Sequence, residues 1–485
     1  MLDAHHFDNT FARLPDVFYT HQSPLPLVNP ELVSYSPEAA ALIDMPSLEG
    51  IKSELIAVCS GNALCPGTEP LAMVYAGHQF GGYSPQLGDG RALLLGEVRN
   101  KAGEKWDLHL KGAGPTPYSR FGDGRAVLRS CIREYLCSEA MYHLGIPSTR
   151  ALCVVTSDTP VYRERQERGS TLLRLARTHV RFGHFEYFNY TGQHKALKTL
   201  ADYIIDHLFP YLKGQKNAYQ LWFAEVLNKT AKLIAQWQAA GFAHGVMNTD
   251  NMSITGDTLD YGPFGFLDSF DWQFVCNHSD HQGRYAFGEQ PDVSYWNCGR
   301  LGSALMPLFN NQPDTLQEAL NTYPERYSYY YTLFMRQKLG LVLPQNSDDQ
   351  LIKQLLSALQ HSQCDYTRFF RALCDFVPGA VNHALTSVVD TRPMAQWLKT
   401  YAQRLQKETV SDTARGYQMK QVNPKYILRN HLAQQAIELA EGGDFSEVER
   451  LMLMLKKPFD EQPDNAHYAN SPPAGVLQVQ VSCSS

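Results

Sequence analysis

The feature of this sequence that most restricts its fold is a long amphipathic segment that leads directly into a polar loop. Between about Ala218 and Ala240, apolar residues recur at helical spacing and form one face, namely Leu221, Ala224, Leu227, Ala231 and Ile234. Gly241 is typical of a residue that ends a helix. The polar stretch 244–251 follows, and we predict a short hairpin after it that ends at Asp260.

A helix, a polar loop and a hairpin that ends in an acid are the arrangement in which protein-kinase-like folds present their metal-binding groups. In those folds, an asparagine at the loop end and the aspartate of a later Asp-Phe-Gly triplet hold magnesium ions on the nucleotide phosphates. Asn251 and Asp260 occupy these two positions. The sequence therefore predicts an α+β, protein-kinase-like bilobal fold with a metal-assisted nucleotide site.

The loop departs from the kinase pattern at the residue that should remove a proton. A protein kinase carries its catalytic aspartate two residues after the loop histidine. Here His244 is followed at that position by Val246, which can neither accept a proton nor bind a metal. Asp250 is the only carboxylate in the loop. A phosphotransferase that uses the kinase mechanism is therefore disfavoured, although it stays open as an alternative.

A glycine-rich stretch precedes two predicted strands. Gly88 and Gly90 lie in this stretch, whose density of glycine allows backbone N–H groups to approach an anion. The runs 92–98 and 105–111 are typical of strands, with a turn between them. A lone Gly-x-Gly most often marks only a turn, so the stronger indication is its position before a hairpin that ends in Lys111.

Lys111 gains significance from a glutamate farther along the chain. A strand-end lysine is in general a solvated charge. In a kinase-like small lobe, however, the nucleotide lysine lies on the strand after the glycine loop and pairs with a glutamate of the next helix. The predicted helix 126–143 contains Glu134. Between the two residues, 121–125 form a second glycine-rich turn at a helix N-terminus, which is a natural phosphate site.

An anion-binding pocket near Lys111 depends on where two arginines point. The segment 150–190 is predicted to form strands and contains Arg174 and Arg181. Side chains seven positions apart on one strand face opposite sides unless a bulge intervenes, so a surface position is the simpler interpretation for each arginine. Convergence of the two near Lys111 would instead form a strongly anion-binding pocket.

Composition limits the classes of protein to which the chain can belong. Its 485 residues are 44% hydrophobic and 19% charged, enough to bury a sizeable core. We expect residues 1–183 to form an N-terminal segment and N-lobe, and residues 184–485 a helical C-lobe with a helical extension and a tail. A net charge of −6 argues against a nucleic-acid partner. Because there is no signal-peptide pattern and no apolar run of membrane-spanning length, we expect a cytoplasmic monomer without a membrane partner.

The cysteine content is consistent with a reduced compartment. There are 10 cysteines, with neither CxxC pairs nor zinc-ligand spacing. Most of them, such as Cys131 and Cys153, lie in apolar surroundings typical of inert core residues. Cys483 lies near the end of a polar tail, and from its chemistry alone an exposed thiol without a role is the simpler interpretation.

Motifs spread over nearly the whole chain resemble the selenoprotein O family. The residues that carry the likeness are 87–91, 111–120, 122–125, 244–251, 260–268, 423–426 and 483–485. The resemblance implies a kinase-like bilobal fold and a protein adenylyltransferase activity. Members of this family bind ATP in an orientation flipped relative to kinases. They transfer AMP to Ser, Thr or Tyr hydroxyls of proteins, and the chain itself is one candidate acceptor.

The resemblance also implies roles for individual residues. Asp250 matches the proposed catalytic base, while Asn251 and Asp260 match ligands of Mg²⁺, with Mn²⁺ as an alternative ion. Lys111 and Glu134 match a supporting ion pair. Nucleotide contacts are implied for Gly88, Gly90, Arg91, Lys111, Asp123, Gly124, Arg174, Arg181 and Asp260.

The chemistry of AMP transfer agrees with these assignments. Pyrophosphate is displaced from the α-phosphorus, so negative charge builds on the β and γ phosphates as they leave. A cluster of Lys111, Arg174 and Arg181 would stabilise that charge. The absence of a carboxylate at position 246 is then compatible with catalysis, because the reacting phosphorus lies elsewhere. A catalytically silent nucleotide-binding scaffold stays open as a further alternative.

The family context favours a functional interpretation of Cys483. We expect a reversible disulfide between Cys483 and another cysteine, with Cys276 as the candidate partner. Cys276 lies just beyond the metal loop in a stretch typical of a loop rather than a core strand. Such a disulfide would tie the tail to the lobe that holds the site and would gate activity.

Overall fold

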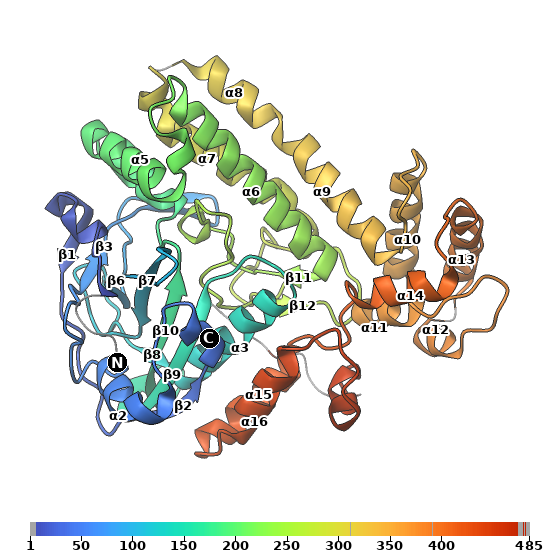
Figure 1. Cartoon of the computed structure of the whole chain (residues 1–485), viewed down its shortest axis with the longest axis horizontal. Helices are drawn as coiled ribbons and strands as arrows, with labels where there is room; N and C mark the ends of the chain where they lie inside the picture. Colours follow the sequence, from blue (N-terminus) through green and yellow to red (C-terminus); the bar gives the residue numbers. More distant parts are fainter. Residues whose placement is uncertain (1–5, 311, 390, 474–478, 480, 482–485) are drawn as a thin grey trace.

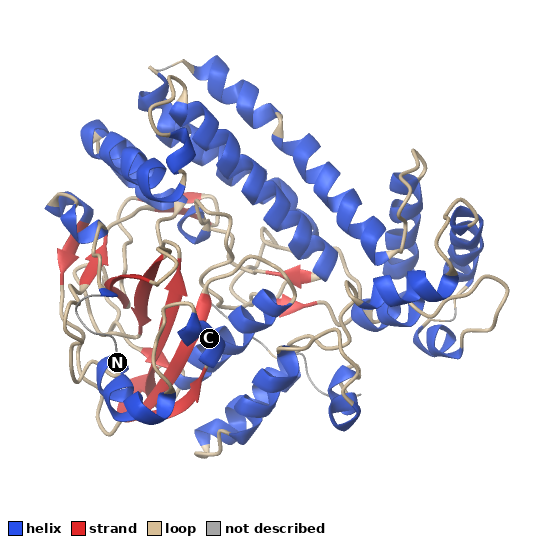
Figure 2. Ribbon diagram, viewed as in Figure 1, coloured by secondary structure: helices blue, strands red, loops and turns tan. Residues whose placement is uncertain are grey.

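The computed structural model describes residues 6–310, 312–389, 391–473, 479 and 481. A β-rich N-terminal part and a larger helical part make up the molecule (Figures 1 and 2). Long helices in the middle of the chain extend away from the strands, whereas the last helices, red in Figure 1, return to the β-rich part.

One antiparallel sheet forms the centre of the β-rich part. Its strands follow the order β1 (Tyr19–His21), β3 (Leu71–Met73), β6 (Ala92–Arg99), β7 (Lys105–Lys111), β10 (Gln166–Ala176), β9 (Arg150–Tyr162) and β2 (Glu31–Tyr35), and β8 (Ala126–Val127) pairs with β10. The predicted strands 92–98 and 105–111 are confirmed as β6 and β7. Lys111 lies opposite Ala92 on one side and Leu172 on the other, so it occupies the middle of the sheet.

Both faces of β7 are covered, which explains why its polar residues are buried. Leu108 and Leu110 belong to a hydrophobic cluster shared with helix α2 (Leu48–Cys59). The alternate residues His109 and Lys111 point to the opposite face, and they are only 0% and 2% exposed. Buried polar groups need partners, and for Lys111 the partner is supplied by the helix on that face.

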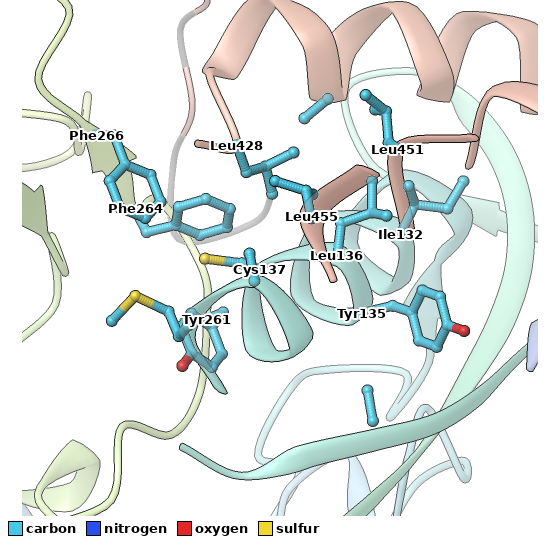
Figure 3. Packing of buried hydrophobic residues seen from close by; sticks show 14 of the residues in the cluster. Ile132, Tyr135, Leu136, Cys137, Tyr261, Phe264, Phe266, Leu428, Leu451 and Leu455 are labelled. Carbon is cyan, nitrogen blue, oxygen red and sulfur yellow. The ribbon is translucent and has the colours of Figure 1, made fainter. Parts of the chain in front are cut away.

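Helix α3 (Leu128–His143) lies between the sheet and the C-terminal helices α15 (Asn430–Glu441) and α16 (Ser446–Leu455). It begins slightly later than the predicted helix 126–143, because the first two residues pair with β10. Figure 3 shows the core shared by α3 and α16, which includes Ile132, Tyr135, Leu136, Leu451 and Leu455. The C-terminal helices therefore help to hold the helix that carries Glu134.

Helix α6 spans Ala218–Ala240, as predicted, and ends at Gly241. Gly241 has a φ of 71°, a left-handed conformation that glycine adopts at low cost. The helix packs against α7 (Gln290–Leu305) and α9 (Tyr323–Lys338). Because it is buried between these neighbours, α6 gives a rigid support to the loop that follows it.

The short hairpin predicted between residues 252 and 260 is wrong, because the residues there pair with distant segments instead of with one another. Ser253 forms an isolated bridge with Arg181, and Thr258 forms one with Ser148. The predicted strand character of 150–190 is also wrong after Ala176, since Phe182–Tyr190 forms helix α4. The short segment between β10 and α4 therefore leaves the sheet and meets the loop that precedes Asp260.

The remaining elements are mainly helices of the C-terminal part. They are α1 (Pro37–Ala41), α5 (His194–Leu208), α8 (Pro313–Asn321), α10 (Asp348–Ser362), α11 (Tyr366–Leu373), α12 (His383–Val388), α13 (Arg392–Leu405) and α14 (Asp412–Lys420). Two small sheets join β4 (Gly77–Gln79) to β5 (Gly82–Ser84) and β11 (Phe242–Ala243) to β12 (Gly265–Phe266), and Thr249–Asn251 forms the short 3-10 helix η5. Among the residues that the structure describes, no helix combines the length and apolarity needed to cross a membrane.

Candidate active site

A cavity of about 550 Å³ is enclosed by residues of the sheet and of the loop that follows α6. Most of the predicted site residues line it, namely Gly88, Gly90, Arg91, Lys111, Asp123, Gly124, Arg174, Arg181, Asp250, Asn251 and Asp260. Glu134 does not line the cavity but contacts Lys111, which does. Cys276 lies outside the cavity, and Cys483 lies outside the described residues.

Glu134 joins three elements through buried ion pairs. Lys111 Nζ on β7 lies 2.7 Å from Glu134 Oε2 on α3 and also donates to Ser130 Oγ at 3.0 Å. Arg174 on β10 donates to the same carboxylate through Nε at 2.6 Å and Nη2 at 2.9 Å. Burial raises the pKa of Glu134, but the charges of Arg174 and Lys111 outweigh burial and hold that pKa below its ordinary value.

Asp260 lies where two arginines converge. Arg174 Nη1 is 2.9 Å from Asp260 Oδ1, and Arg181 Nη1 donates to Asp260 Oδ2. Burial alone would raise the pKa of Asp260, yet the charges of Arg181 and Arg174 hold that pKa far below its ordinary value. Asp260 also has a φ of 57°, a left-handed conformation that is uncommon outside glycine. The ion pairs hold the carboxylate at this position.

The two arginines meet although a single strand would place them on opposite faces. Strand β10 ends at Ala176, and Arg181 occupies the N-cap of α4, so their spacing no longer lies along one strand. Arg181 also donates to the backbone oxygen of Asp250 at 2.8 Å and lies 4.9 Å from the centre of the Tyr75 ring. The cluster of cationic side chains, whose existence the sequence could not decide, is therefore present.

Asp250 is a buried carboxyl with one unsatisfied oxygen. The residue is 7% exposed, and its Oδ1 has no hydrogen-bond partner in the described part of the chain. Gln79 Nε2 donates to Oδ2 at 3.3 Å. Burial raises the pKa of Asp250 to about 7, although the charge of Arg181 lowers it in part. A carboxyl that titrates near neutral pH and lines a cavity is suited to general-base catalysis.

The β4–β5 hairpin positions this carboxyl, although the sequence did not single out its residues. A Cβ on Gly77 would lie 2.5 Å from Asp250 Oδ1, so the β4 backbone packs directly on the carboxyl. His78 N donates to Thr249 Oγ1 at 2.7 Å, and Thr249 Oγ1 donates to Glu186 Oε2 at 2.8 Å. The local density of glycine is a signal for close backbone approach, but it does not say which residue the backbone approaches.

Asn251 and Asp260 provide oxygens at the place predicted for a divalent cation. Asn251 Nδ2 donates to the backbone oxygen of Val246 at 3.0 Å, which orients the amide and leaves Oδ1 for another ligand. Among the described residues, no group of three or more His, Cys, Asp or Glu side chains is arranged to hold a metal. Two such oxygens are an incomplete ligand set of the kind that proteins complete for Mg²⁺ with substrate phosphates.

Two glycines of the lining are required by close packing. Gly88 has a φ of 86°, and a Cβ there would lie 2.5 Å from a ring atom of Tyr118. Gly124 has a φ of 67°, and a Cβ there would lie 2.1 Å from a backbone oxygen. Asp123, beside Gly124, pairs with Arg163 at 2.8 Å. Arg163 lines the cavity too, and the sequence reasoning missed it.

The lining is strongly cationic. Its lysine and arginine side chains outnumber its carboxylates, and they are Arg91, Lys111, Arg120, Arg125, Arg163, Arg174 and Arg181. Burial lowers the pKa of Lys111, and the nearby charges of Arg91 and Arg174 lower it further, while Glu134 opposes them. A concave surface of this kind concentrates anions, so the cavity favours a polyanionic ligand such as a nucleoside triphosphate.

Comparison with known proteins finds matches over nearly the whole chain. The family model described as "Protein adenylyltransferase SelO" matches residues 2–456. A protein nucleotidyltransferase YdiU of Myxococcus xanthus (strain DK1622) is 52% identical, over 100% of this chain and 99% of its own length. Relatives with the same name from Azotobacter vinelandii (strain DJ) and Vibrio cholerae serotype O1 are 52% and 50% identical. They match 99% and 100% of this chain, and 98% and 99% of their own lengths.

Proposed function

This chain belongs to the protein adenylyltransferase SelO family, and we propose that it transfers AMP from ATP to Ser, Thr or Tyr hydroxyls of proteins. The observation that carries the proposal is Asp250. Burial raises its pKa to about 7, one of its oxygens has no hydrogen-bond partner among the described residues, and the residue lines a cavity rich in cations. A hydroxyl acceptor needs such a base, and a triphosphate needs such cations.

The transfer step assigns one task to each group. The acceptor oxygen forms a bond to the α-phosphorus while the bond from that phosphorus to the β-phosphate oxygen breaks. The acceptor proton passes to the Asp250 carboxylate. Pyrophosphate leaves with the negative charge, which Lys111, Arg174 and Arg181 stabilise. Convergence of these cations on shared carboxylates supports a triphosphate whose β and γ phosphates lie at this buried end, flipped relative to kinases.

Asn251 and Asp260 would hold Mg²⁺, or Mn²⁺ in its place, against the phosphates. The bound ion would neutralise phosphate charge. The Asn251 amide oxygen and the Asp260 carboxylate are ligands of the kind that these ions prefer. Arg174 and Arg181 pair with the two oxygens of the Asp260 carboxylate and hold it in place.

The same proposal includes a protein-kinase-like fold, with residues 1–183 in the N-lobe and residues 184–485 in the C-lobe. The pairing of a strand lysine, Lys111, with a helix glutamate, Glu134, supports it, because kinase N-lobes carry such a pair. The separation of strands and helices in Figure 2 agrees with two lobes. The loop after α6 then supplies the base and the metal ligands from the helical lobe.

Two alternatives fit the site less well. A phosphotransferase with the kinase mechanism needs a base where Val246 stands, and Val246 lines the cavity without a group that can accept a proton. A silent nucleotide-binding scaffold needs no base at all. The unsatisfied buried oxygen of Asp250 and its pKa of about 7, raised by burial, cost stability and would serve no purpose in such a scaffold.

We also propose that Cys276 and Cys483 form a reversible disulfide that ties the tail to the loop of the base. Cys276 is buried, and a Cβ on Gly245 would lie 2.6 Å from its Sγ, so the thiol packs under that loop. Val481 forms a parallel bridge with Asn277. Val481 precedes Cys483 by two residues in the sequence, and Asn277 directly follows Cys276.

Incubation with ATP labelled at the α or the γ phosphate tests the proposed activity, with Mg²⁺ present and lysate proteins as acceptors. We expect protein-bound label from the α position only. Asp260→Ala should abolish this label while circular dichroism shows an unchanged fold, because the variant lacks a metal ligand. Label from the γ position only would identify a kinase, and absence of both labels with ATP still bound would identify a scaffold.

A further inference from the structure

A second cavity, of about 650 Å³, lies next to the one that contains Asp250. Phe80 lines both cavities. The second cavity is also lined by Trp272, Val275, Arg284, Glu289, Asp292 and Trp296, which do not line the first. We call this second cavity the side groove.

Phe80 is held at the junction of the two cavities. Its φ is 49°, a left-handed conformation that is rare for a bulky residue and persists only where contacts enforce it. Phe80 N donates to the Tyr285 hydroxyl at 2.8 Å, and the two rings lie 5.1 Å apart. The preceding residue, Gln79, donates to the Asp250 carboxylate. One hairpin tip therefore contacts both the side groove and the base.

Aromatic side chains are concentrated around the side groove. Phe80 and Trp272 are 42% and 37% exposed. Trp296 lies 5.3 Å from the His78 ring, which itself lies 5.1 Å from the ring of the exposed Tyr83. Aromatic residues are enriched at protein interfaces, and their faces attract cations. The aromatic lining of the side groove is therefore suited to bind a protein segment. The proposed transfer reaction requires such a segment as its second substrate.

Charges in the side groove are distributed unevenly. The Arg284 guanidinium lies 4.8 Å from the centre of the Trp296 ring and packs against the backbone of Gly81, at the end next to the nucleotide cavity. Glu289 and Asp292 are exposed. Asp292 stands one helical turn before Trp296 on α7, so the carboxylate and the indole share a face. Arg284 and Arg300 already lie against the Trp296 ring, whereas Trp272 is exposed and packs beside Gly288, the neighbour of Glu289. Trp272 with the two carboxylates is therefore the suitable site for a lysine or arginine side chain.

We propose that the side groove binds an extended segment of the acceptor protein that carries a lysine or arginine a few residues from the modified hydroxyl. The basic side chain lies against Trp272 and is neutralised by Glu289 and Asp292, while the hydroxyl passes Phe80 to reach Asp250. This inference rests on the proposed AMP transfer and names the substrate class of that same site.

Peptides of matched length test the preference. Each carries one Ser, Thr or Tyr, flanked either by lysine and arginine or by aspartate and glutamate, and each is incubated with α-labelled ATP and Mg²⁺. We expect kcat/KM to be about tenfold higher for the basic peptides. The advantage should shrink as salt is raised, because the charges are exposed. A parallel reaction with lysate proteins shows whether AMP transfer itself occurs.

Substitution of the two acidic residues tests whether the preference for basic peptides depends on the side groove or on the rest of the protein surface. Glu289→Gln with Asp292→Asn should remove most of the preference by raising KM for basic peptides, while kcat and the KM for ATP stay unchanged. Asp314→Asn with Glu318→Gln is the matched control, because these two exposed carboxylates lie on another helix, α8, and line neither cavity. This control should keep the preference for basic peptides.

Each result of this experiment decides between the proposals. Equal turnover of basic and acidic peptides would overturn the proposed role of the side groove, and so would a preference that survives in the Glu289 and Asp292 variant. Neither result would contradict AMP transfer itself. Labelled lysate proteins without any labelled peptide would overturn recognition of an extended segment. Absence of label on both peptides and lysate proteins would overturn the proposed function itself.

Discussion

At the scale of single residues, Asp250 links catalysis to pH. Burial raises its pKa to about 7, and only the ionised form can accept the acceptor's proton. The initial rate of AMP transfer should therefore rise with pH through a midpoint near 7 and be lost below it. Asp250→Asn should lower kcat by about 10²- to 10⁴-fold with little change in ATP binding. A rate of the wild-type protein that is flat from about pH 5.5 to 8.5 would exclude Asp250 as the base.

The same raised pKa has a consequence for folding. The pKa is about 7 in the folded protein against an ordinary value of 3.8, so the folded state binds the proton more tightly. The stabilisation that this proton provides is complete below the ordinary pKa and is lost as pH rises through 7. Asp250→Asn cannot ionise, so its free energy of unfolding at pH 8 should exceed that of the wild type by ~4 kcal/mol. Urea unfolding should show the difference closing toward pH 4.

At the scale of elements, strand β4 determines where the base lies. A Cβ on Gly77 would lie 2.5 Å from Asp250 Oδ1, so Gly77→Ala must displace either the strand or the carboxyl. We expect kcat to fall about tenfold or more, while equilibrium binding of ATP changes little. Gly50→Ala in helix α2 is the control, because its Cβ would meet nothing within 4 Å. Unchanged activity in Gly77→Ala would mean that this contact does not position the base.

One carboxylate, that of Glu134, joins helix α3 to strands β7 and β10. Glu134→Ala would leave Lys111 and Arg174 buried without their partner, which should lower the free energy of unfolding by about 3–5 kcal/mol. Burial raises the pKa of Glu134, but Arg174 and Lys111 depress it below 4.5 overall. Its stabilising effect is therefore present above the ordinary pKa and lost as pH falls, so the deficit of the variant should shrink in acid.

Denaturant titration at neutral and acidic pH measures this loss of stability. The control is Glu164→Ala, which removes a carboxylate that is 72% exposed and pairs with Arg129. Exposed pairs contribute only about 0–1 kcal/mol, so this variant should unfold like the wild type. Similar losses in both variants would show that the ion pairs of Glu134 do not hold the three elements together.

At the scale of the whole molecule, Val481 pairs with the segment that follows Cys276. His278 N donates to Val481 O at 2.8 Å, which places Val481 close to Cys276. A disulfide between Cys276 and Cys483 should disturb the packing of the thiol under Gly245. Mild oxidation should therefore lower AMP transfer, and a thiol reductant should restore it.

Two cysteine variants separate this disulfide from general oxidation. Cys483→Ser should be insensitive to the oxidant, whereas Cys364→Ser, which changes a buried cysteine outside both cavities, should remain sensitive. Peptide mapping by mass spectrometry should find Cys276 joined to Cys483 in the oxidised wild type. Loss of activity with Cys483 still unpaired would assign the effect to another residue.

The sequence by itself determined the elements that surround the site and the family to which the chain belongs. Helix α6 and its end at Gly241 follow from apolar spacing and one glycine. Strands β6 and β7 follow from their composition and the turn between them. These predictions are confirmed because the interactions that specify such elements join residues close in sequence. The motifs likewise indicated the family, since they depend only on order and spacing.

Only the tertiary structure decided which side chains meet. Gln79 and Asp250 are separated by 171 residues, and Arg181 and Asp260 by 79. The hairpin predicted before Asp260 is absent because Ser253 pairs with Arg181 and not with a neighbour. Contacts over such separations form when helices and sheet pack into one molecule, and no local pattern encodes them. Burial, which raises the pKa of Asp250 and creates the unsatisfied oxygen at the cavity, is likewise a property of the packed molecule.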